Sequence, residues 1–408
     1  MSRAEGRTPL RVAVAGLGAV AQAVHLPLIN RRPDLFELVS VYDASAALRA
    51  AVGDRFGVPT TRRYASIDSL LDGEAVDAVM IFTGQSHAPA VIAAFKRGYP
   101  VFCEKPLAFT RGEIEQIEAA VPDSSMPSLL LGYMKQYDPA VTETARRLRE
   151  IDDVRSVEIT VLHPTGASQL DFARLVPFAG DVPQADDRPV HRAALGEQDD
   201  AVNRLYSGTL LSSVSHDLSL LRLMTGPPTT IDYVDMWHVP SVDRRRDVGR
   251  DTRALGQHPP SIAISGRLPG DARVSLRWHY LADYPAYRET VSIHHGNGTL
   301  ELAFPSPYLL HAPTELTVTE YIRGFERRSV HRSTAEAFEL QLEAFHDMVT
   351  EGRRPLSSIE DGRIDVETCQ QIMGCFASRT GLELGGEAAA VADLERMDIP
   401  HRAEAEAL

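Results

Sequence analysis

Residues 10–21 read LRVAVAGLGAVA, and this stretch decides the fold of the amino-terminal part. Its first half is an almost unbroken apolar run, as expected for a parallel strand buried on both faces. The run ends in Gly16, Gly18 and Ala21, which supply the G-x-G-x-x-G/A fingerprint. The first glycine permits a tight turn, the second lets a pyrophosphate approach the main chain, and the small third residue lets a helix pack on the strand. The stretch predicts a dinucleotide-binding turn.

The N–H groups at the start of the following helix, including those of Ala19 and Val20, are expected to face the phosphates, because a helix amino terminus favours negative charge. Glycine-rich turns between strand and helix also occur in proteins without a cofactor. The prediction of a dinucleotide site therefore also depends on the strands and helices that follow the turn. Strands are expected at 37–42, 76–84 and 100–103, and helices at 44–56, 88–97 and 111–120. Strands that alternate with helices indicate a doubly wound parallel sheet.

Asp43 comes at the end of the second predicted strand. A carboxylate there accepts hydrogen bonds from the adenosine ribose hydroxyls and repels a 2′-phosphate, which predicts NAD in preference to NADP. The alternative is that Asp43 caps the helix beginning at Ala44, a position where Asp is equally common.

The chain has 408 residues, enough for two or three domains, and a formal net charge of −14. That charge argues against binding to nucleic acid or to an anionic membrane, and the basic run at residues 244–246 is too short to change this. No signal peptide or membrane span is indicated, so a cytoplasmic location is expected. Cys103, Cys369 and Cys375 form neither a CxxC pair nor a cluster with histidine, which predicts buried free thiols and no metal site.

From residue 128 the pattern changes. Helices are expected at 138–150, 215–224, 335–351 and 359–378, with a long loop at 164–200 and successive strands between 230 and 302. The sequence therefore predicts an α/β chain, with an amino-terminal Rossmann doubly wound parallel sheet and a carboxy-terminal α+β domain built on a large, mostly antiparallel sheet. The expected domains are 1–127 for NAD, 128–384 for substrate and oligomer contacts, and an Ala/Glu-rich tail at 385–408. Helices at about 355–380 are candidates for packing back on the first domain.

Residues 83–110 read TGQSHAPAVIAAFKRGYPVFCEKPLAFT, and residues 132–140 read GYMKQYDPA. Both segments, and the EKP triplet at 104–106 above all, resemble the glucose-fructose oxidoreductase/inositol dehydrogenase/rhizopine-catabolism (Gfo/Idh/MocA) oxidoreductase family. The resemblance covers most of the chain and is weakest over 164–200.

This resemblance implies that Lys105 reaches the substrate hydroxyl near the nicotinamide, where a cation stabilises the developing alkoxide. From the sequence alone, a lysine before proline at a strand end is usually a solvated charge. The resemblance also implies cofactor contacts from Thr83, His87, Glu104 and Lys105, and substrate contacts from Lys135 and Tyr137.

A third signature of the family, D-x-G-x-H-x-x-D, aligns with LLSSVSHDLSLLRLMTG at 210–226. His216 is retained as the candidate general base, since an unperturbed imidazole titrates near neutral pH. The family's first Asp is replaced by Ser212, its Gly by Val214 and its second Asp by Ser219. Asp217 is a poor substitute for the lost carboxylate because neighbouring residues on a helix face different ways. Ser212 and Asp217 are kept as candidate substrate contacts, and the alternative for His216 is a buried structural histidine.

The resemblance predicts an NAD-dependent oxidoreductase acting on a secondary alcohol or ketone of a sugar, aminosugar or cyclitol, in a homodimer or homotetramer. Two alternatives stay open because Ser212 replaces the family's Asp. One is a redox-neutral enzyme with tightly bound NAD that catalyses epimerisation, elimination or glycoside cleavage. The other is a catalytically silent NAD-binding protein.

Overall fold

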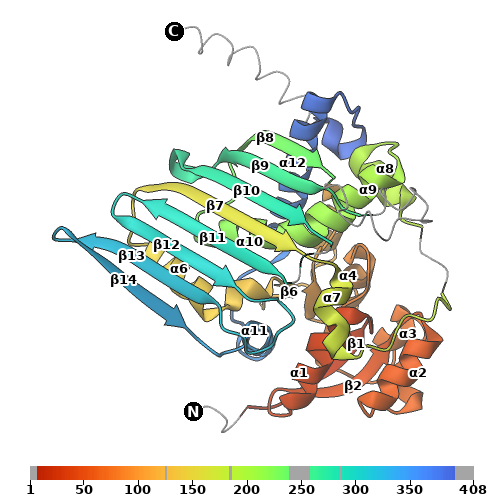
Figure 1. Cartoon of the computed structure of the whole chain (residues 1–408). Coiled ribbons are helices and arrows are strands. Elements are labelled where there is room, and N and C mark those ends of the chain that lie inside the picture. The colour runs from red at the N-terminus through yellow and green to blue at the C-terminus, as the bar shows by residue number, and fades with distance from the viewer. Residues whose placement is uncertain are drawn as a thin grey trace, which may run out of the picture. The chain divides into compact units, whose positions relative to one another are not determined.

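The computed structural model describes residues 7–124, 126–182, 186–238, 258–282, 284 and 286–390. The chain divides into two compact units, each gathered from separate parts of the sequence (Figure 1). The first unit comprises Met1–Asp138, Leu170–Asp187 and Ala335–Arg363, and the second comprises Pro139–Gln169, Arg188–Thr334 and Ile364–Leu408. The domain boundaries drawn at residues 127 and 384 stay predictions. The basic run at 244–246 and most of the predicted tail lie outside the described residues.

The first unit is built on a six-stranded sheet in the order β3-β2-β1-β4-β5-β6, with all neighbours parallel. This confirms the predicted doubly wound sheet. β6 carries the sheet as far as Gly132. Apart from Arg11, the side chains of the central strands are buried, as expected for a parallel sheet covered on both faces. The strands are β1 (Leu10–Ala15), β2 (Phe36–Tyr42), β3 (Arg63–Tyr64), β4 (Ala78–Ile81), β5 (Val101–Glu104) and β6 (Leu129–Gly132).

Helices of the first unit begin where the sequence provides caps. Ser45 and Ser66 cap α2 and α3, and Thr110 forms a reciprocal capping box with Glu113 at the start of α5. The first helix differs from the prediction, because a π-helical turn precedes its α-helical part. The helices are η1 (Ala21–His25), α1 (Leu26–Arg31), α2 (Ala46–Arg55), η2 (Thr60–Arg62), α3 (Ile67–Leu71), α4 (Ala88–Phe95), α5 (Arg111–Ala119), η3 (Met134–Tyr137), η4 (Asp171–Ala173) and α11 (Ala337–Glu351).

The second unit contains an eight-stranded sheet in the order β14-β13-β12-β11-β7-β10-β9-β8. Among the strand pairs that the described residues form in this sheet, only β7–β10 is parallel, which confirms the mostly antiparallel prediction. The sequence reading named no strand at 315–332, where β13 and β14 lie. The strands are β7 (Val154–His163), β8 (Thr230–Trp237), β9 (Ser261–Arg267), β10 (Arg273–Tyr280), β11 (Arg288–His295), β12 (Gly298–Phe304), β13 (Glu315–Ile322) and β14 (Phe325–Arg332).

Short helices occupy much of the segment predicted as a loop at 164–200, so that expectation was wrong for its helical parts. A π-helix also precedes the predicted helix at 215–224, which begins and ends as expected. The helices are α6 (Pro139–Leu148), α7 (Gly166–Leu170), α8 (Arg188–Leu195), α9 (Asp200–Arg204), η5 (Leu205–Val214), α10 (Ser215–Met224), η7 (Pro269–Asp271) and α12 (Ile359–Thr380), whose first residues belong to the first unit.

All three cysteines are free and buried, as predicted. Across the described ranges, none of the helices combines the length and the apolar character needed to traverse a lipid bilayer.

Candidate functional site

The glycine turn after β1 has the geometry that a dinucleotide requires. Gly16 has a φ of 99°, and a Cβ built on it would lie 2.5 Å from the carbonyl carbon and oxygen of Phe82 and 2.6 Å from the main-chain nitrogen of Thr83. Only glycine fits that position. Gly18 differs, because a Cβ there would meet nothing within 4 Å. Ala21 is fully buried where the helix packs on the sheet. The open main chain at Gly18 is therefore free for a diphosphate to approach.

Asp43 ties this turn to the end of β2. Its Oδ2 accepts a hydrogen bond from the Leu17 N–H at 2.8 Å, and its Oδ1 accepts one from the Ser45 N–H, also at 2.8 Å. Ser45, rather than Asp43, caps α2, because the Ser45 Oγ accepts from the Leu48 N–H at 3.1 Å. The carboxylate is thus fixed at the carboxyl end of β2, where the ribose contact is predicted.

Lys105 follows β5 at the same edge of the parallel sheet. The Lys105–Pro106 peptide bond is cis. Burial lowers the pKa of Lys105, and the nearby Lys135 ammonium lowers it further, while the Glu104 carboxylate opposes both effects. Lys135 is itself buried. The structure therefore brings two of the predicted site lysines close enough to interact.

A buried hydrogen-bonded pair, His25 and Glu104, was not predicted from the sequence and directly precedes this lysine in the site. His25 Nε2 and Glu104 Oε1 are 2.8 Å apart, and Glu104 Oε2 accepts a hydrogen bond from the Lys105 N–H at 3.2 Å. Burial raises the pKa of Glu104, but the hydrogen bond from His25 and the charges around it outweigh burial, so the pKa lies below its ordinary value. The His25 ring is fully buried and stacks on Phe82 with centroids 4.1 Å apart. The pair holds an ionised carboxylate in place beside Lys105.

His87 lies just before α4 and is buried, like Glu104. Its Nδ1 donates to the Pro106 carbonyl oxygen at 2.6 Å, because a carbonyl oxygen can only accept. Burial lowers the pKa of His87, so the ring is neutral at physiological pH. This contact joins the β4–α4 turn to the turn that carries Lys105. The predicted cofactor contacts of His87 and Thr83 stay predictions.

Tyr137 is hydrogen-bonded to the segment that follows α11. Its hydroxyl oxygen accepts a hydrogen bond from the Leu356 N–H at 3.2 Å, and burial raises the pKa of Tyr137 to about 12. The neighbouring Gln136 Oε1 accepts from the Ser357 hydroxyl at 2.7 Å. Both contacts fix the connection between α11 and α12. The predicted substrate contact of Tyr137 stays a prediction.

His216 lies in the second unit at the start of α10, directly after the π-helix η5. Ser212 stands four residues earlier, and both side chains are partly exposed. Ser219 is buried, and its hydroxyl donates to the His216 carbonyl oxygen at 2.7 Å. π-Helical turns are rare and are often found at functional sites. The residues that align with the family's third signature thus share one helical segment.

Asp217 is almost completely buried, unlike His216. Burial raises the pKa of Tyr287 well above its ordinary value, and the charges of Glu289 and Asp217 add to this effect. The Tyr287 hydroxyl is hydrogen-bonded to Glu289, which is fully buried. Asp217 thus lies close enough to Tyr287 for its charge to affect that hydroxyl, and its predicted substrate contact stays a prediction.

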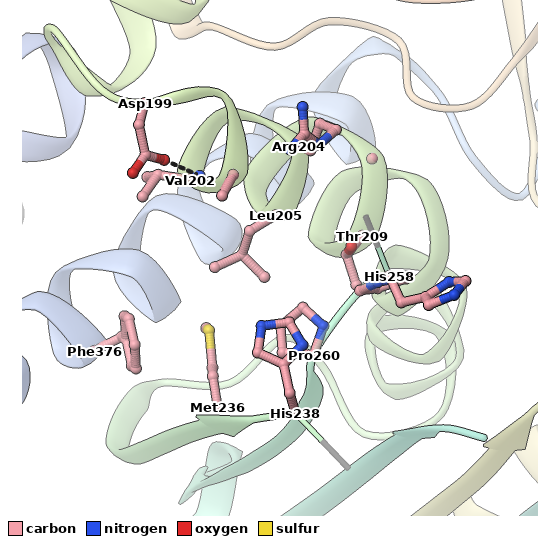
Figure 2. Close-up of a pocket in the computed structure, with 13 residues that line it drawn as sticks. Asp199, Val202, Arg204, Leu205, Thr209, Met236, His238, His258, Pro260 and Phe376 are labelled. Atoms are coloured by element: carbon pink, nitrogen blue, oxygen red, sulfur yellow. Dashed lines mark hydrogen bonds between the residues drawn. The ribbon is translucent and has the colours of Figure 1, made fainter. Parts of the chain in front are cut away.

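The second unit also contains a pocket of about 420 Å³. Figure 2 shows Met236 and His238 at the end of β8 facing Leu205 and Phe376 across it. Its wall also includes Arg204, and Asp199 at its edge caps α9 by accepting from the Val202 N–H at 2.9 Å. None of the predicted site residues lines this pocket.

Comparison with known proteins identifies the family. Residues 10–127 match the GFO_IDH_MocA model, described as an oxidoreductase family with an NAD-binding Rossmann fold. The inositol 2-dehydrogenase of Leifsonia xyli subsp. xyli is 33% identical over 351 residues, covering 84% of this chain and 86% of that protein. The match to the inositol 2-dehydrogenase of Corynebacterium glutamicum (strain R) is shorter, with 32% identity over 131 residues, 32% of this chain and 38% of that protein.

A solved structure of similar fold is the myo-inositol 2-dehydrogenase of Lactobacillus plantarum, with a TM-score of 0.64 and 19% identity, covering 93% of this chain and 99% of that one. The glycine turn, the two sheets and the relative that matches most of the chain all point to the same family. The chain belongs to the Gfo/Idh/MocA oxidoreductase family and carries that family's NAD-binding Rossmann fold.

Proposed function

We propose that this protein is an NAD-dependent dehydrogenase that transfers a hydride between the nicotinamide ring and a secondary alcohol or ketone of a cyclitol or sugar. One observation carries the proposal. The open glycine turn at Gly18 and the partly buried cation of Lys105 both lie at the carboxyl edge of the same parallel sheet. In open α/β sheets, ligands bind at this edge.

The residues of the first unit fit the cofactor. Gly16 and Gly18 give the diphosphate access to the main chain, and the start of η1 offers N–H groups and a favourable dipole. When bound, the nicotinamide supplies the hydride chemistry, for which the protein contributes position and charge. Asp43 supports NAD over NADP because its fixed carboxylate would lie beside a 2′-phosphate.

Lys105 is proposed to bind the reacting oxygen. Its ammonium stabilises negative charge on that oxygen as the proton leaves, and the burial of Lys105 strengthens this effect. The His25–Glu104 pair serves Lys105 in two ways. It fixes the main chain through the Lys105 N–H, and its carboxylate counters the loss of the ammonium proton that burial favours.

His216 is proposed as the base that accepts the hydroxyl proton. The partial exposure of His216 supports this role over the alternative of a buried structural histidine, because a base must be within reach of the substrate. Ser212, four residues earlier, is the nearest counterpart of the family's carboxylate and can offer a hydroxyl but no charge. A hydroxyl raises the basicity of an imidazole less than a carboxylate does, so we expect a modest rate. The substrate class rests on the relatives named inositol 2-dehydrogenase.

The test is an assay of coenzyme-stripped protein with NAD and NADP against cyclitols, sugars and aminosugars, with coenzyme reduction as the readout. We expect reduction of NAD by at least one cyclitol or sugar, and its loss in Lys105→Met and His216→Asn. Protein that binds NAD and converts a substrate without net NADH formation would support the redox-neutral alternative. Protein that binds NAD but turns over nothing in the panel, even as Ser212→Asp, would support the silent one.

A further inference from the structure

A segment far along the sequence lies against the glycine turn of the first unit. Residues 176–181, named the strap here, belong to the first unit although they follow α7 of the second. Figure 1 shows this part of the chain passing α2. At one end of the strap, the Val176 N–H donates to the Gln22 Oε1 at 2.8 Å, and the Gln22 Nε2 donates to the Val176 carbonyl at 3.2 Å.

Gln22 connects the strap directly to the turn. It is only 2% exposed, and its Nε2 also donates to the Leu17 carbonyl at 2.8 Å. A buried amide with both of its heteroatoms bonded to main chain fixes the position of the segment it binds. Val176 is thereby held beside the residues proposed to receive the diphosphate.

At its other end, the strap places an acid on the amino terminus of α2. The Asp181 Oδ2 accepts from the Ala47 N–H at 3.1 Å. The Ser45 hydroxyl, and after it the Ala47 N–H, hold the pKa of Asp181 below its ordinary value, so the side chain is an anion. Asp43, which is proposed to meet the ribose, bonds to the Ser45 N–H of the same turn. The strap thus joins the diphosphate end of the proposed cofactor site to its ribose end.

The amino terminus of α2 is where a 2′-phosphate would find N–H donors. Asp181 takes the Ala47 N–H, and Asp43 takes that of Ser45. The nearby Arg49, a possible phosphate partner, donates instead to the carbonyl oxygens of Asp43 and Ala44 at 2.5 and 2.9 Å. The position therefore already holds an anion that belongs to the chain itself. Between the two ends, Phe178 leaves 60% of its surface exposed, and an aromatic face of that kind suits a purine base.

From these contacts we propose that the strap completes the adenosine-binding site, with Asp181 excluding a 2′-phosphate and Phe178 covering the adenine. This inference rests on the proposed function, because it assumes that a nicotinamide coenzyme lies on the glycine turn. It adds two recognition residues to that site, about 140 residues away from Asp43 in the sequence and invisible to the glycine fingerprint.

The test is a calorimetric titration of coenzyme-stripped full-length protein with NADH and NADPH. Asp181→Asn is expected to bind NADPH roughly threefold to tenfold more tightly than the wild type, about the effect of one charge pair near a surface, with NADH affinity unchanged. Phe178→Ala is expected to bind both coenzymes about fivefold more weakly, because both contain adenine. The matched control is Asp171→Asn, which removes the same charge from an exposed position just ahead of the strap.

The proposal is overturned if either Asp181→Asn or Phe178→Ala binds both coenzymes like the wild type, or if Asp171→Asn has the same effect as Asp181→Asn. In those cases NADH binding by the wild type still stands, and with it the proposed function. If the wild type binds neither coenzyme, the proposed function fails and the strap proposal fails with it. Thermal unfolding of each variant is expected to match that of the wild type, because Phe178 is exposed and the amide oxygen introduced by Asp181→Asn can still accept from the Ala47 N–H.

Discussion

Replacing each of the two glycines of the nucleotide turn with Ala should have different effects: Gly16→Ala should lower stability, and Gly18→Ala should lower cofactor affinity. Replacing Gly16 with Ala forces a side chain into a backbone at φ 99° and places its Cβ 2.5 Å from the Phe82 carbonyl. The left-handed conformation costs about 1–2 kcal/mol, and displacement of tightly packed main chain adds about 1–3 kcal/mol. We expect Gly16→Ala to destabilise the first unit by about 2–5 kcal/mol, which lowers its melting temperature by roughly 5–15 °C.

Gly18→Ala provides the matched control, because a Cβ at Gly18 meets no atom within 4 Å. Its thermal stability should equal or slightly exceed that of the wild type, since Ala restricts the unfolded chain more than Gly does. The added methyl group instead occupies the space that the diphosphate needs. We expect NADH affinity to fall about tenfold to a hundredfold, or about 1.4–3 kcal/mol.

Differential scanning calorimetry measures the stability of both variants, and fluorescence titration with NADH measures their affinity. A wild-type melting temperature for Gly16→Ala would contradict the close contact at that glycine, and wild-type NADH affinity for Gly18→Ala would contradict the diphosphate site. A variant at Gly18 that unfolds at a much lower temperature would also contradict it, because that site would then be packed rather than open.

Three further predictions concern the residues around the proposed site. Lys105→Met should lower kcat about a hundredfold to a thousandfold, and a normal kcat would remove Lys105 from the reaction. Since burial lowers the pKa of Lys105, the free energy of unfolding of the wild type should increase as the pH rises from that lowered pKa towards 10.5. Thermal melts of Lys105→Met across the same pH range should lack this increase. His25→Ala should destabilise the protein by about 3–5 kcal/mol, because it leaves Glu104 buried without its partner. In the wild type, the stability that comes from the lowered pKa of Glu104 should be fully present above pH 4.5 and be lost as the pH falls through that lowered pKa. An unchanged melting curve for the variant would exclude the pair as a stabilising contact. Tyr137→Phe should cost about 1 kcal/mol through the lost hydrogen bond from Leu356 and should raise KM, because the hydroxyl is also a predicted substrate contact, and an unchanged KM would contradict that contact.

Local patterns were sufficient to predict the parallel half of the fold. The apolar run from Leu10 and the glycines after it lead into β1 and its turn, and the Thr110 and Glu113 capping box lies where the helix at 111–120 was expected. Each of these features depends on neighbours in the sequence, so the sequence alone contains the information.

Strand β14 was missed for a physical reason. Its residues, FERRSVHR at 325–332, are mostly exposed because the strand lies at the edge of the sheet. Edge strands are commonly protected from further pairing by charged side chains, so they lack the alternation of apolar and polar residues that marks a half-buried strand.

The site residues divide in the same way. Lys105 could be proposed from the sequence because it stands in the EKP triplet at 104–106. His25 is one histidine in an apolar helix, and its contact with Glu104 is visible only in the folded structure. The contact of Gln22 with Val176 goes to main chain, which every residue type carries, so no residue pattern could predict it. Contacts that depend on tertiary structure require the fold to be known.

The most direct test of the account is isotope transfer. The protein would be incubated with NAD and a panel of cyclitols and sugars that carry deuterium on their carbinol carbons, and the reduced coenzyme would be analysed by mass spectrometry. We predict that NADH forms and carries one deuterium from at least one substrate, and that Lys105→Met forms almost none. NADH that forms without the label, or coenzyme that binds and is never reduced by any member of the panel, would contradict the claim that this chain transfers a hydride from a secondary alcohol.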